Sequence, residues 1–126
     1  MWYYAAFTAV PNTNGFSTLA EHYADHGAEF GSITVADYSH LADELWVSPK
    51  PRHVEECRRR RGDTLRFDTL SESFGVVDKN NLIRTFFKPI PCHRVPLPRR
   101  NVMRQEGRCH GWADNLTYFR EACKQW

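Results

Sequence analysis

The sequence has no hydrophobic run long enough to cross a membrane. The opening stretch, residues 1–10, is apolar but much shorter than the roughly 20 residues that a spanning helix needs. It also lacks the basic leader of a signal peptide. We therefore expect no membrane partner and a cytoplasmic location, with delivery into a target cell left open. The aromatic side chains of this stretch favour a core strand over residues 1–10.

Cysteine spacing typical of zinc sites is also absent. The four cysteines include no C-x-x-C pair. No carboxylates cluster at metal-ligand spacing, so we expect no metal and no cofactor. Without an export signal, reduced thiols are the first expectation. Zinc stays open because of Cys92-His93 and Cys109-His110, although neighbouring residues rarely both reach one ion. Disulfides stay open if a partner exports the protein.

Basic residues are scarce in the first part of the chain. Residues 1–51 contain one basic residue and six acidic ones, a net charge of −5. Residues 52–126 contain sixteen basic and nine acidic residues, a net charge of +7. A basic half attracts polyanions such as nucleic acids. The alternative is a charge pattern that serves solubility alone.

The chain shows no internal repeat, and its 126 residues fit one domain spanning 1–126. Thr18 and Glu21 form a capping box that starts a helix, and Gly27 is placed to end it in a left-handed conformation. Thr34 is a candidate cap for a second helix with an apolar stripe at helical spacing. The stripe consists of Val35, Tyr38, Leu41, Ala42, Leu45 and Trp46.

The second half of the chain is rich in strand signals. Residues 53–61 are predicted as a short third helix, residues 89–108 as a long loop, and residues 114–123 as a last helix. Short polar turns separate three predicted strands, at residues 64–68, 74–78 and 82–88. The predicted fold is α+β, with N-terminal helices packed on a small antiparallel meander and a C-terminal helix.

Three segments within residues 18–89 together resemble a known family. They are HYADHGAEFG, VADYSHLADELW and RGDTLRFDTLSESFGVVDKNNLIRTFFKP. Their pattern is a His-Gly near a helix end, an Arg-aromatic-Asp strand, a Phe-Gly strand and a strand ending Arg-Thr-aromatic-aromatic-Lys-Pro. This order resembles small bacterial and prophage toxin domains, which are ribonucleases of the barnase, EndoU, colicin and RelE-like fold. The closing segment HGWADNLTYFREAC also resembles the end of such domains.

The resemblance implies both a fold and a reaction. Helices would pack on one face of a small antiparallel sheet, and the other face would bind RNA. The ribose 2′-hydroxyl would attack the adjacent phosphate, so no metal and no protein nucleophile is required. Such a reaction needs a base, an acid and cations where negative charge builds up. The resemblance further implies a cellular RNA as substrate and a cognate immunity or antitoxin protein as partner.

Histidines are the candidate proton carriers. His26 matches the His of the family's His-Gly pair, and free imidazole titrates near neutral pH. The alternative is that His26 only caps its helix end, where a cation is favoured. His22 lies one turn earlier. It is either a second proton carrier that contacts the substrate or an ordinary surface residue.

The last predicted strand carries the candidate catalytic cations. Period-two alternation puts Arg84 and Lys88 on one face, where they could clamp a phosphate. The alternative is an edge strand charged against aggregation. Thr85 falls on the opposite face unless a bulge changes the alternation. It either joins the site or packs structurally.

Arg66 and Asp68 share a face of another predicted strand. They either bind substrate, with Arg66 on a phosphate, or form a structural ion pair. The run Arg58–Arg61 is expected to be a solvated or RNA-skirting surface. Two other function classes stay open: a non-catalytic nucleic-acid-binding module and a purely structural protein.

Overall fold

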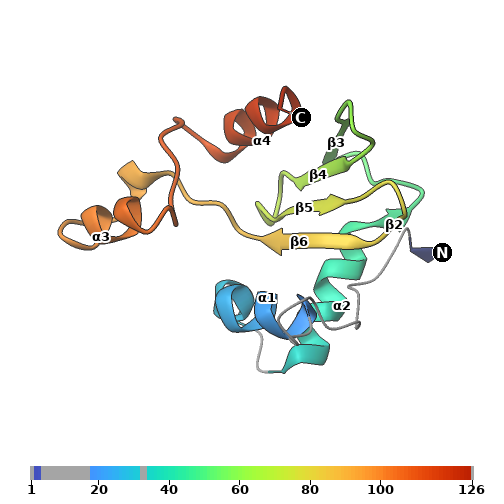
Figure 1. Ribbon diagram of the computed structural model, residues 1–126, viewed down its shortest axis with the longest axis horizontal. Coiled ribbons are helices and arrows are strands. Elements are labelled where there is room, and N and C mark those ends of the chain that lie inside the picture. The colour runs from blue at the N-terminus through green and yellow to red at the C-terminus, as the bar shows by residue number, and fades with distance from the viewer. Residues whose placement is uncertain (1, 4–17, 32–33, 126) are drawn as a thin grey trace.

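A four-stranded antiparallel sheet lies between two layers of helix in the computed structural model, which describes residues 2–3, 18–31 and 34–125 (Figure 1). The strands are β1 (Trp2–Tyr3), β2 (Val47–Ser48), β3 (Val54–Arg58), β4 (Thr64–Asp68), β5 (Phe74–Val77) and β6 (Ile83–Phe87). The helices are α1 (Thr18–His26), η1 (Gly27–Phe30), α2 (Val35–Leu45), η2 (Cys92–Arg94), α3 (Arg99–Gln105) and α4 (Asn115–Cys123).

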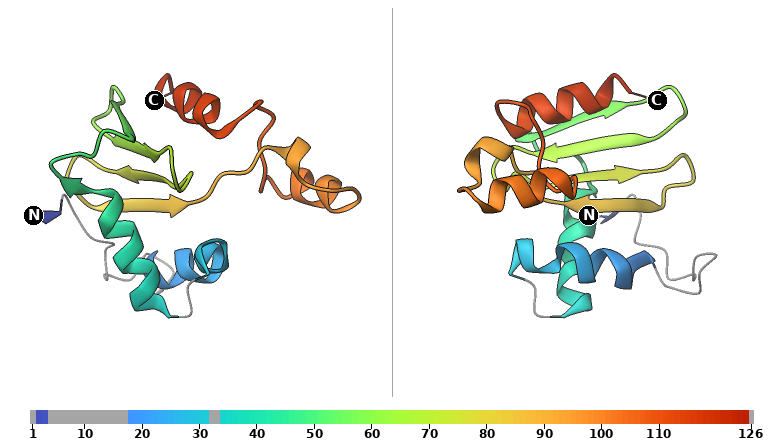
Figure 2. Two further views of the ribbon diagram at one scale, coloured as in Figure 1. Left: turned by 180° about the vertical axis from the view of Figure 1, so that it is seen from behind. Right: turned by 60° about the vertical axis from the view of Figure 1, so that its left-hand side comes forward.

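The strand order β3-β4-β5-β6 is a simple meander, and the short β1 pairs with β2. Figure 2 shows α1 and α2 on one side of the sheet, α4 on the other, and α3 on an arm that extends beyond the end of β6. The predicted α+β class, with helices on an antiparallel meander and a C-terminal helix, is confirmed. Of the strand predicted over residues 1–10, only β1 lies within the described residues.

The first core lies between α2 and the sheet. It contains buried side chains of α2, its C-cap and the strands: Tyr38, Ala42, Leu45, Trp46, Val54, Val77, Ile83 and Phe86. Gly75 of β5 permits the close packing of α2 on the sheet, because a Cβ at this position would lie 2.8 Å from Leu45 Cδ2. The second core lies under α4 and contains Leu65, Phe67, Phe74, Val76 and Phe119. Alternate residues of β5 therefore face different cores, with Phe74 and Val76 in the second and Val77 in the first, as the pleat requires.

The helix ends are partly as predicted. The Thr34 side chain accepts a hydrogen bond from the Asp37 backbone N–H at 3.0 Å, so the predicted cap of α2 is confirmed. The predicted left-handed cap at Gly27 is wrong, because Gly27 starts η1 and Gly31 takes the left-handed conformation with φ of 65°. Gly27 serves close packing instead, since a Cβ there would lie 2.7 Å from the Tyr23 ring.

The helix predicted over residues 53–61 is wrong. Val54–Arg58 forms strand β3, which pairs with β4 in a five-residue register. Val54 packs in the first core and Cys57 against the second, which is the period-two pattern of a strand. The loop predicted over residues 89–108 is also partly wrong, because it contains η2 and the short helix α3.

The expectation of reduced thiols is wrong as well. Cys57 bonds to Cys123, and Cys92 bonds to Cys109, so all four cysteines form disulfides and none is available to zinc. The first bond fixes α4 to β3, and the second closes the arm that carries α3. Within the described residues, no helix is long and apolar enough to cross a membrane.

Candidate active site

A bulge in β6 decides which side chains share a cavity. Val77 pairs with Ile83 and Val76 with Thr85, so Arg84 is an extra residue in the ladder. The simple alternation that put Arg84 and Lys88 on one face is therefore broken. Arg84 and Thr85 line one cavity, as a bulge would allow, whereas Lys88 lines another. The predicted Arg84–Lys88 phosphate clamp is thus not assembled.

The cavity that Lys88 lines, which we term the His26 cavity, has a volume of about 350 Å³. It lies where η1, the end of β6 and the segment before α4 meet. The lining residues that matter for chemistry are His26, Thr85, Lys88, Arg108, His110 and Tyr118. Three of the four residues predicted to be catalytic are therefore together, and Arg84 is the exception.

His26 and Glu29 form a hydrogen-bonded pair that lines this cavity. His26 Nδ1 lies 2.7 Å from Glu29 Oε2, and the His26 side chain is 27% exposed. A carboxylate on Nδ1 fixes the tautomer and leaves Nε2 to accept a proton. The His26 ring also packs on Phe87, with ring centroids 5.3 Å apart. The imidazole is thus oriented by two contacts and still reaches solvent.

Glu29 also connects this helical layer to the strand that carries the cations. Its other oxygen, Oε1, accepts the backbone N–H of Lys88 at 2.8 Å. The Lys88 ammonium lies 5.2 Å from the centre of the Phe30 ring, a cation–π distance. His26 and Lys88 are therefore placed relative to one another through a single carboxylate.

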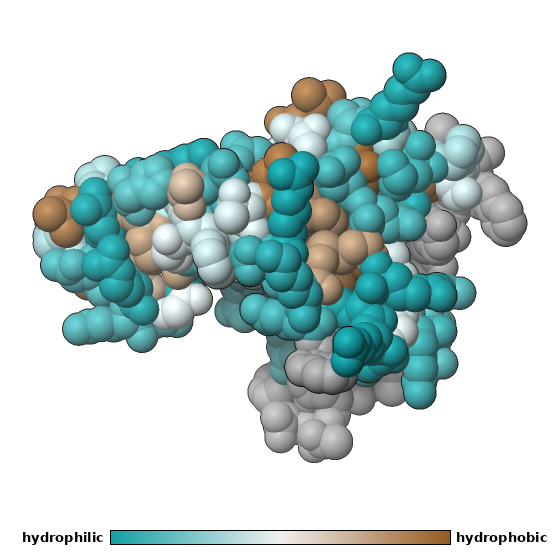
Figure 3. Space-filling view, turned by 90° about the horizontal axis from the view of Figure 1, so that it is seen from above, coloured by the Kyte–Doolittle hydropathy of each residue, from teal (hydrophilic) through white to brown (hydrophobic). Residues whose placement is uncertain are grey.

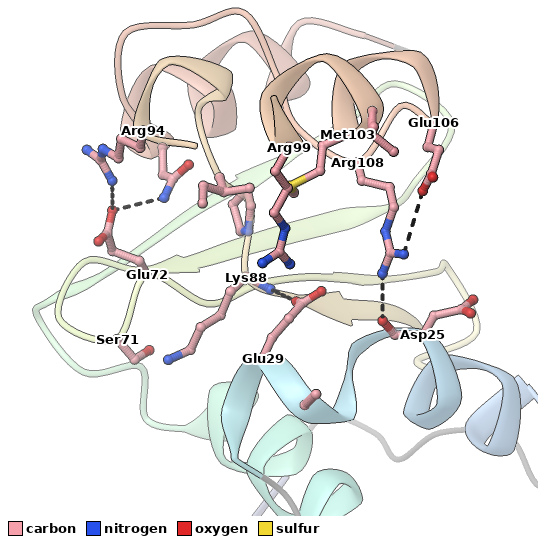
Figure 4. Close-up of a pocket in the computed structure, with 15 residues that line it drawn as sticks. Asp25, Glu29, Ser71, Glu72, Lys88, Arg94, Arg99, Met103, Glu106 and Arg108 are labelled. Atoms are coloured by element: carbon pink, nitrogen blue, oxygen red, sulfur yellow. Dashed lines mark hydrogen bonds and ion pairs between the residues drawn. The ribbon is translucent and has the colours of Figure 1, made fainter. Parts of the chain in front are cut away.

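The His26 cavity adjoins a larger one, of about 730 Å³, under the arm; we term it the arm cavity. Lys88 and Arg108 line both cavities. Figure 4 shows Glu29 and Asp25 on the helical side, facing Arg99 and Arg108 from the arm. Arg108 donates to the Asp25 carbonyl at 3.4 Å, so the arm rests on the end of α1 through a guanidinium.

Two aromatic residues of the site were missed by sequence reasoning. Tyr118 and His110 stack with ring centroids 4.6 Å apart. Burial raises the pKa of Tyr118, so this residue stays a protonated phenol at neutral pH. In the sequence, Tyr118 counted only as part of an apolar helix face. The one available signal was the closing segment that resembles the family's end.

His110 is held by both of its ring nitrogens. Nδ1 accepts the Trp112 backbone N–H at 3.2 Å, so Nε2 carries the proton and donates to Asn115 Oδ1 at 2.7 Å. Burial lowers the pKa of His110 from its ordinary value. The Asn115 amide in turn donates to Glu72 at 2.9 Å. We interpret His110 as a neutral residue that positions Tyr118, not as a proton carrier.

Arg66 is not available to a substrate. It is 1% exposed, and its guanidinium lies 5.3 Å from the Trp46 ring centre. Its Nε donates to Glu56 at 2.6 Å, and its Nη1 donates to the carbonyls of Leu45 and Val47, both at 3.0 Å. This arginine therefore ties α2 to the sheet and has a structural role.

Asp68 and His22 also lie outside the cavity that contains His26. Neither alternative for Asp68 is seen, because it pairs with another residue than Arg66 and caps the next turn by accepting the N–H groups of Leu70 and Ser71. Its other oxygen lies 3.4 Å from His53. His22 stands one turn before His26 on α1, with ring centroids 6.4 Å apart, and does not line the His26 cavity.

The second cavity at β6, which we term the Arg84 cavity, has a volume of about 600 Å³. Thr85 lines it as well as the His26 cavity, so the two adjoin along the strand. Its charged lining consists of Arg59, Arg61, Lys79 and Arg84 with Asp63 and Asp78. Two arginines of the run Arg58–Arg61, Arg59 and Arg61, therefore line a cavity, whereas the sequence predicted only a solvated or RNA-skirting surface for this run.

The sheet face opposite α1 and α2 is not open along its whole width. Helix α4 packs on β4 and is fixed to β3 by the Cys57–Cys123 disulfide. Over β3 and β4, α4 therefore covers the face that the resemblance assigns to RNA. Figure 3 views the molecule from the α4 side and shows hydrophilic residues over much of this surface, with smaller apolar areas between them.

A scan of protein-family models and a search of curated proteins found no match to this chain. Among the residues that the structure describes, no three His, Cys, Asp or Glu side chains form a cluster that could hold a metal ion.

Proposed function

We propose that this chain is a metal-independent endoribonuclease of the toxin type, which cleaves cellular RNA through attack of the ribose 2′-hydroxyl on the adjacent phosphate. The observation that carries the proposal is the His26–Glu29 pair in one cavity with Lys88, Thr85 and Tyr118. A base, an oriented partner for it, cations and hydroxyl donors are the groups that this reaction needs.

His26 has the geometry of a general base. With Nδ1 directed at Glu29, Nε2 takes the proton of the 2′-hydroxyl as this oxygen bonds to phosphorus. Glu29 stabilises the imidazolium that forms. The charge that builds up on the phosphate oxygens is met by Lys88 and Arg108, and the Thr85 hydroxyl donates to the same oxygens.

Tyr118 is the candidate donor for the departing oxygen. When the bond from phosphorus to the 5′ oxygen breaks, the alkoxide takes the phenol proton, because an alkoxide is a far stronger base than a phenolate. Burial raises the pKa of Tyr118 and keeps this proton in place beforehand. The proton on His26 then returns to Tyr118 through solvent. The products are a 2′,3′-cyclic phosphate and a 5′-hydroxyl.

The proposal extends to partners and delivery. Disulfides form in oxidising compartments, whereas the RNA substrate is cytoplasmic, so the protein would fold outside the cytoplasm and be delivered into a target cell. A cognate immunity or antitoxin protein would protect the producing cell. The arginines of the arm, such as Arg94 and Arg99, favour an acidic surface on that partner.

The test is cleavage of single-stranded RNA by the purified, disulfide-bonded protein. We expect cleavage by the parent and by His40→Ala, and a loss of about 10²- to 10⁴-fold in His26→Ala. His40 is a matched control because it is exposed on α2, where it pairs with Glu44. An RNA with 2′-O-methyl groups at every position should resist cleavage. A protein that binds RNA tightly but never cuts it would support the alternative, a non-catalytic binding module.

A further inference from the structure

The Arg84 cavity holds more positive charge than its own acids neutralise. Four cations and two carboxylates line it, which leaves a net charge of +2. Arg84 and Arg61 are 54% and 62% exposed, so both can meet a ligand. Arg59 is only 12% exposed, and its buried Nε has no hydrogen-bond acceptor in the described part of the chain. Arg59 therefore adds positive charge to the cavity wall, and Arg61 and Arg84 supply the N–H groups that a ligand can reach.

The two carboxylates are already used to hold the arginines in place. Asp63 Oδ2 lies 2.9 Å from both Arg59 Nη2 and Arg61 Nε. Asp78 accepts the backbone N–H groups of Asn80 and Leu82 with one oxygen and lies 3.1 Å from Arg84 Nε with the other. The guanidiniums are thus held in place from two parts of the fold, the turn after β3 and the strand β6, and each has further N–H donors for an anion.

The cavity also continues into the candidate reaction centre. Thr85 lines both the Arg84 cavity and the His26 cavity. Arg59 lies close enough to Tyr118 for its charge to offset part of the effect of burial on the pKa of the phenol. A chain of regularly spaced anions that enters one cavity would therefore pass into the other.

We propose that the Arg84 cavity binds a phosphodiester of single-stranded RNA that neighbours the phosphate in the His26 cavity. This inference rests on the proposed function for the identity of the polyanion. Arg84 then contributes to substrate affinity and register, and Lys88 alone of the two faces the reacting phosphate. The bulge in β6 separates the two roles, because it turns Arg84 away from the His26 cavity.

The test uses a fluorescent 2′-O-methyl oligoribonucleotide, which cannot undergo the proposed reaction, so binding is measured without cleavage. The variants are Arg84→Gln and Arg61→Gln, with Arg52→Gln as the control. Gln keeps a donor for the local carboxylate while removing the charge. Arg52 precedes the start of β3, whereas Arg59 follows its end, so the control lies at the far end of the strand.

We expect Arg84→Gln and Arg61→Gln each to weaken binding by about 5- to 20-fold. The slope of log affinity against log salt should fall by about 0.7 for each lost phosphate contact. Arg52→Gln should stay within twofold of the parent. Unchanged affinity in both cavity variants would overturn the inference, and so would an equal loss in the control. RNA cleavage by the parent is scored separately, so a parent that binds but does not cut would overturn the ribonuclease proposal and leave the anion site standing.

Discussion

Glu29 bridges His26 and Lys88, the residue that follows β6. Its two carboxylate oxygens lie 2.7 Å from His26 Nδ1 and 2.8 Å from the Lys88 backbone nitrogen. One carboxylate therefore orients the candidate base and sets its position relative to the candidate cation. In the proposed mechanism, Glu29 is a positioning residue, because it acts through His26.

Replacing Glu29 should lower the rate of cleavage without unfolding the protein. Glu29→Gln keeps a hydrogen-bond acceptor for His26 but removes the charge that stabilises the imidazolium, so the rate should fall by about 10- to 100-fold. Glu29→Asp, which restores the charge, should recover part of this loss. Cleavage rates and melting temperatures of the parent and both variants provide the comparison. A folded Glu29→Gln protein that cleaves RNA at the parental rate would contradict the assignment.

Cleavage should continue in the presence of EDTA. The proposed reaction uses only side-chain base, acid and cations, so a chelator has nothing to remove. The measurement is the cleavage rate of the same RNA with and without EDTA after dialysis. Activity that disappears and returns only with added zinc or magnesium would contradict the mechanism.

Local patterns in the sequence predicted most of the fold. Alternation and short polar turns placed β4, β5 and β6 within one residue of their observed ends. The last helix was predicted over residues 114–123, and α4 begins at Asn115 with Asp114 as its N-cap. The strand β3 was missed because Arg58–Arg61 suggested a helix end. Its strand conformation depends on pairing with β4 and on the distant Cys123, neither of which a local pattern contains.

The candidate site was predictable only in part for a similar reason. His26, Thr85 and Lys88 lie in short segments that match the family pattern, and the structure brings them together. The separation of Arg84 from Lys88 depends on a bulge that nothing in the sequence marks. Tyr118 reaches the cavity because α4 packs back on the sheet, which is a tertiary contact between segments far apart in the chain.

His110 should make the protein less stable in mild acid. Burial lowers its pKa below the ordinary value of 6.5, and a proton on Nδ1 would break the bond from the Trp112 N–H. The unfolded chain then binds more protons than the folded one below about pH 6.5. The contribution of this residue is thus fully present above that pH and is lost as the pH falls toward the lower, folded pKa. Urea midpoints between pH 5 and 8 should fall with acid in the parent and less steeply in His110→Gln. Equal slopes would show that His110 does not carry the effect.

The two disulfides should contribute unequally to stability. Their cysteines are separated by 66 and 17 residues, and the lost chain entropy gives about 4 and about 3 kcal/mol respectively. Replacing both Cys57 and Cys123 with Ser should therefore lower the melting temperature more than replacing Cys92 and Cys109. It should also reduce cleavage, because α4 carries Tyr118. A larger thermal loss from the shorter loop would contradict this ranking.

Double variants should show that His26 and Lys88 act as a unit, whereas Arg84 acts separately from His26. His26 and Lys88 are placed by the same carboxylate, so removing either should disable much of the same transition-state contact. The double variant His26→Ala with Lys88→Ala should be little slower than the slower single variant. Arg84 lies in the adjoining cavity and affects binding, so the losses in kcat/KM from His26→Ala and Arg84→Gln should multiply. Melting temperatures of all variants exclude loss of folding as the cause. Independent, multiplying effects of His26 and Lys88 would show that they do not act as a unit, and strong coupling of His26 to Arg84 would place Arg84 at the reacting phosphate after all.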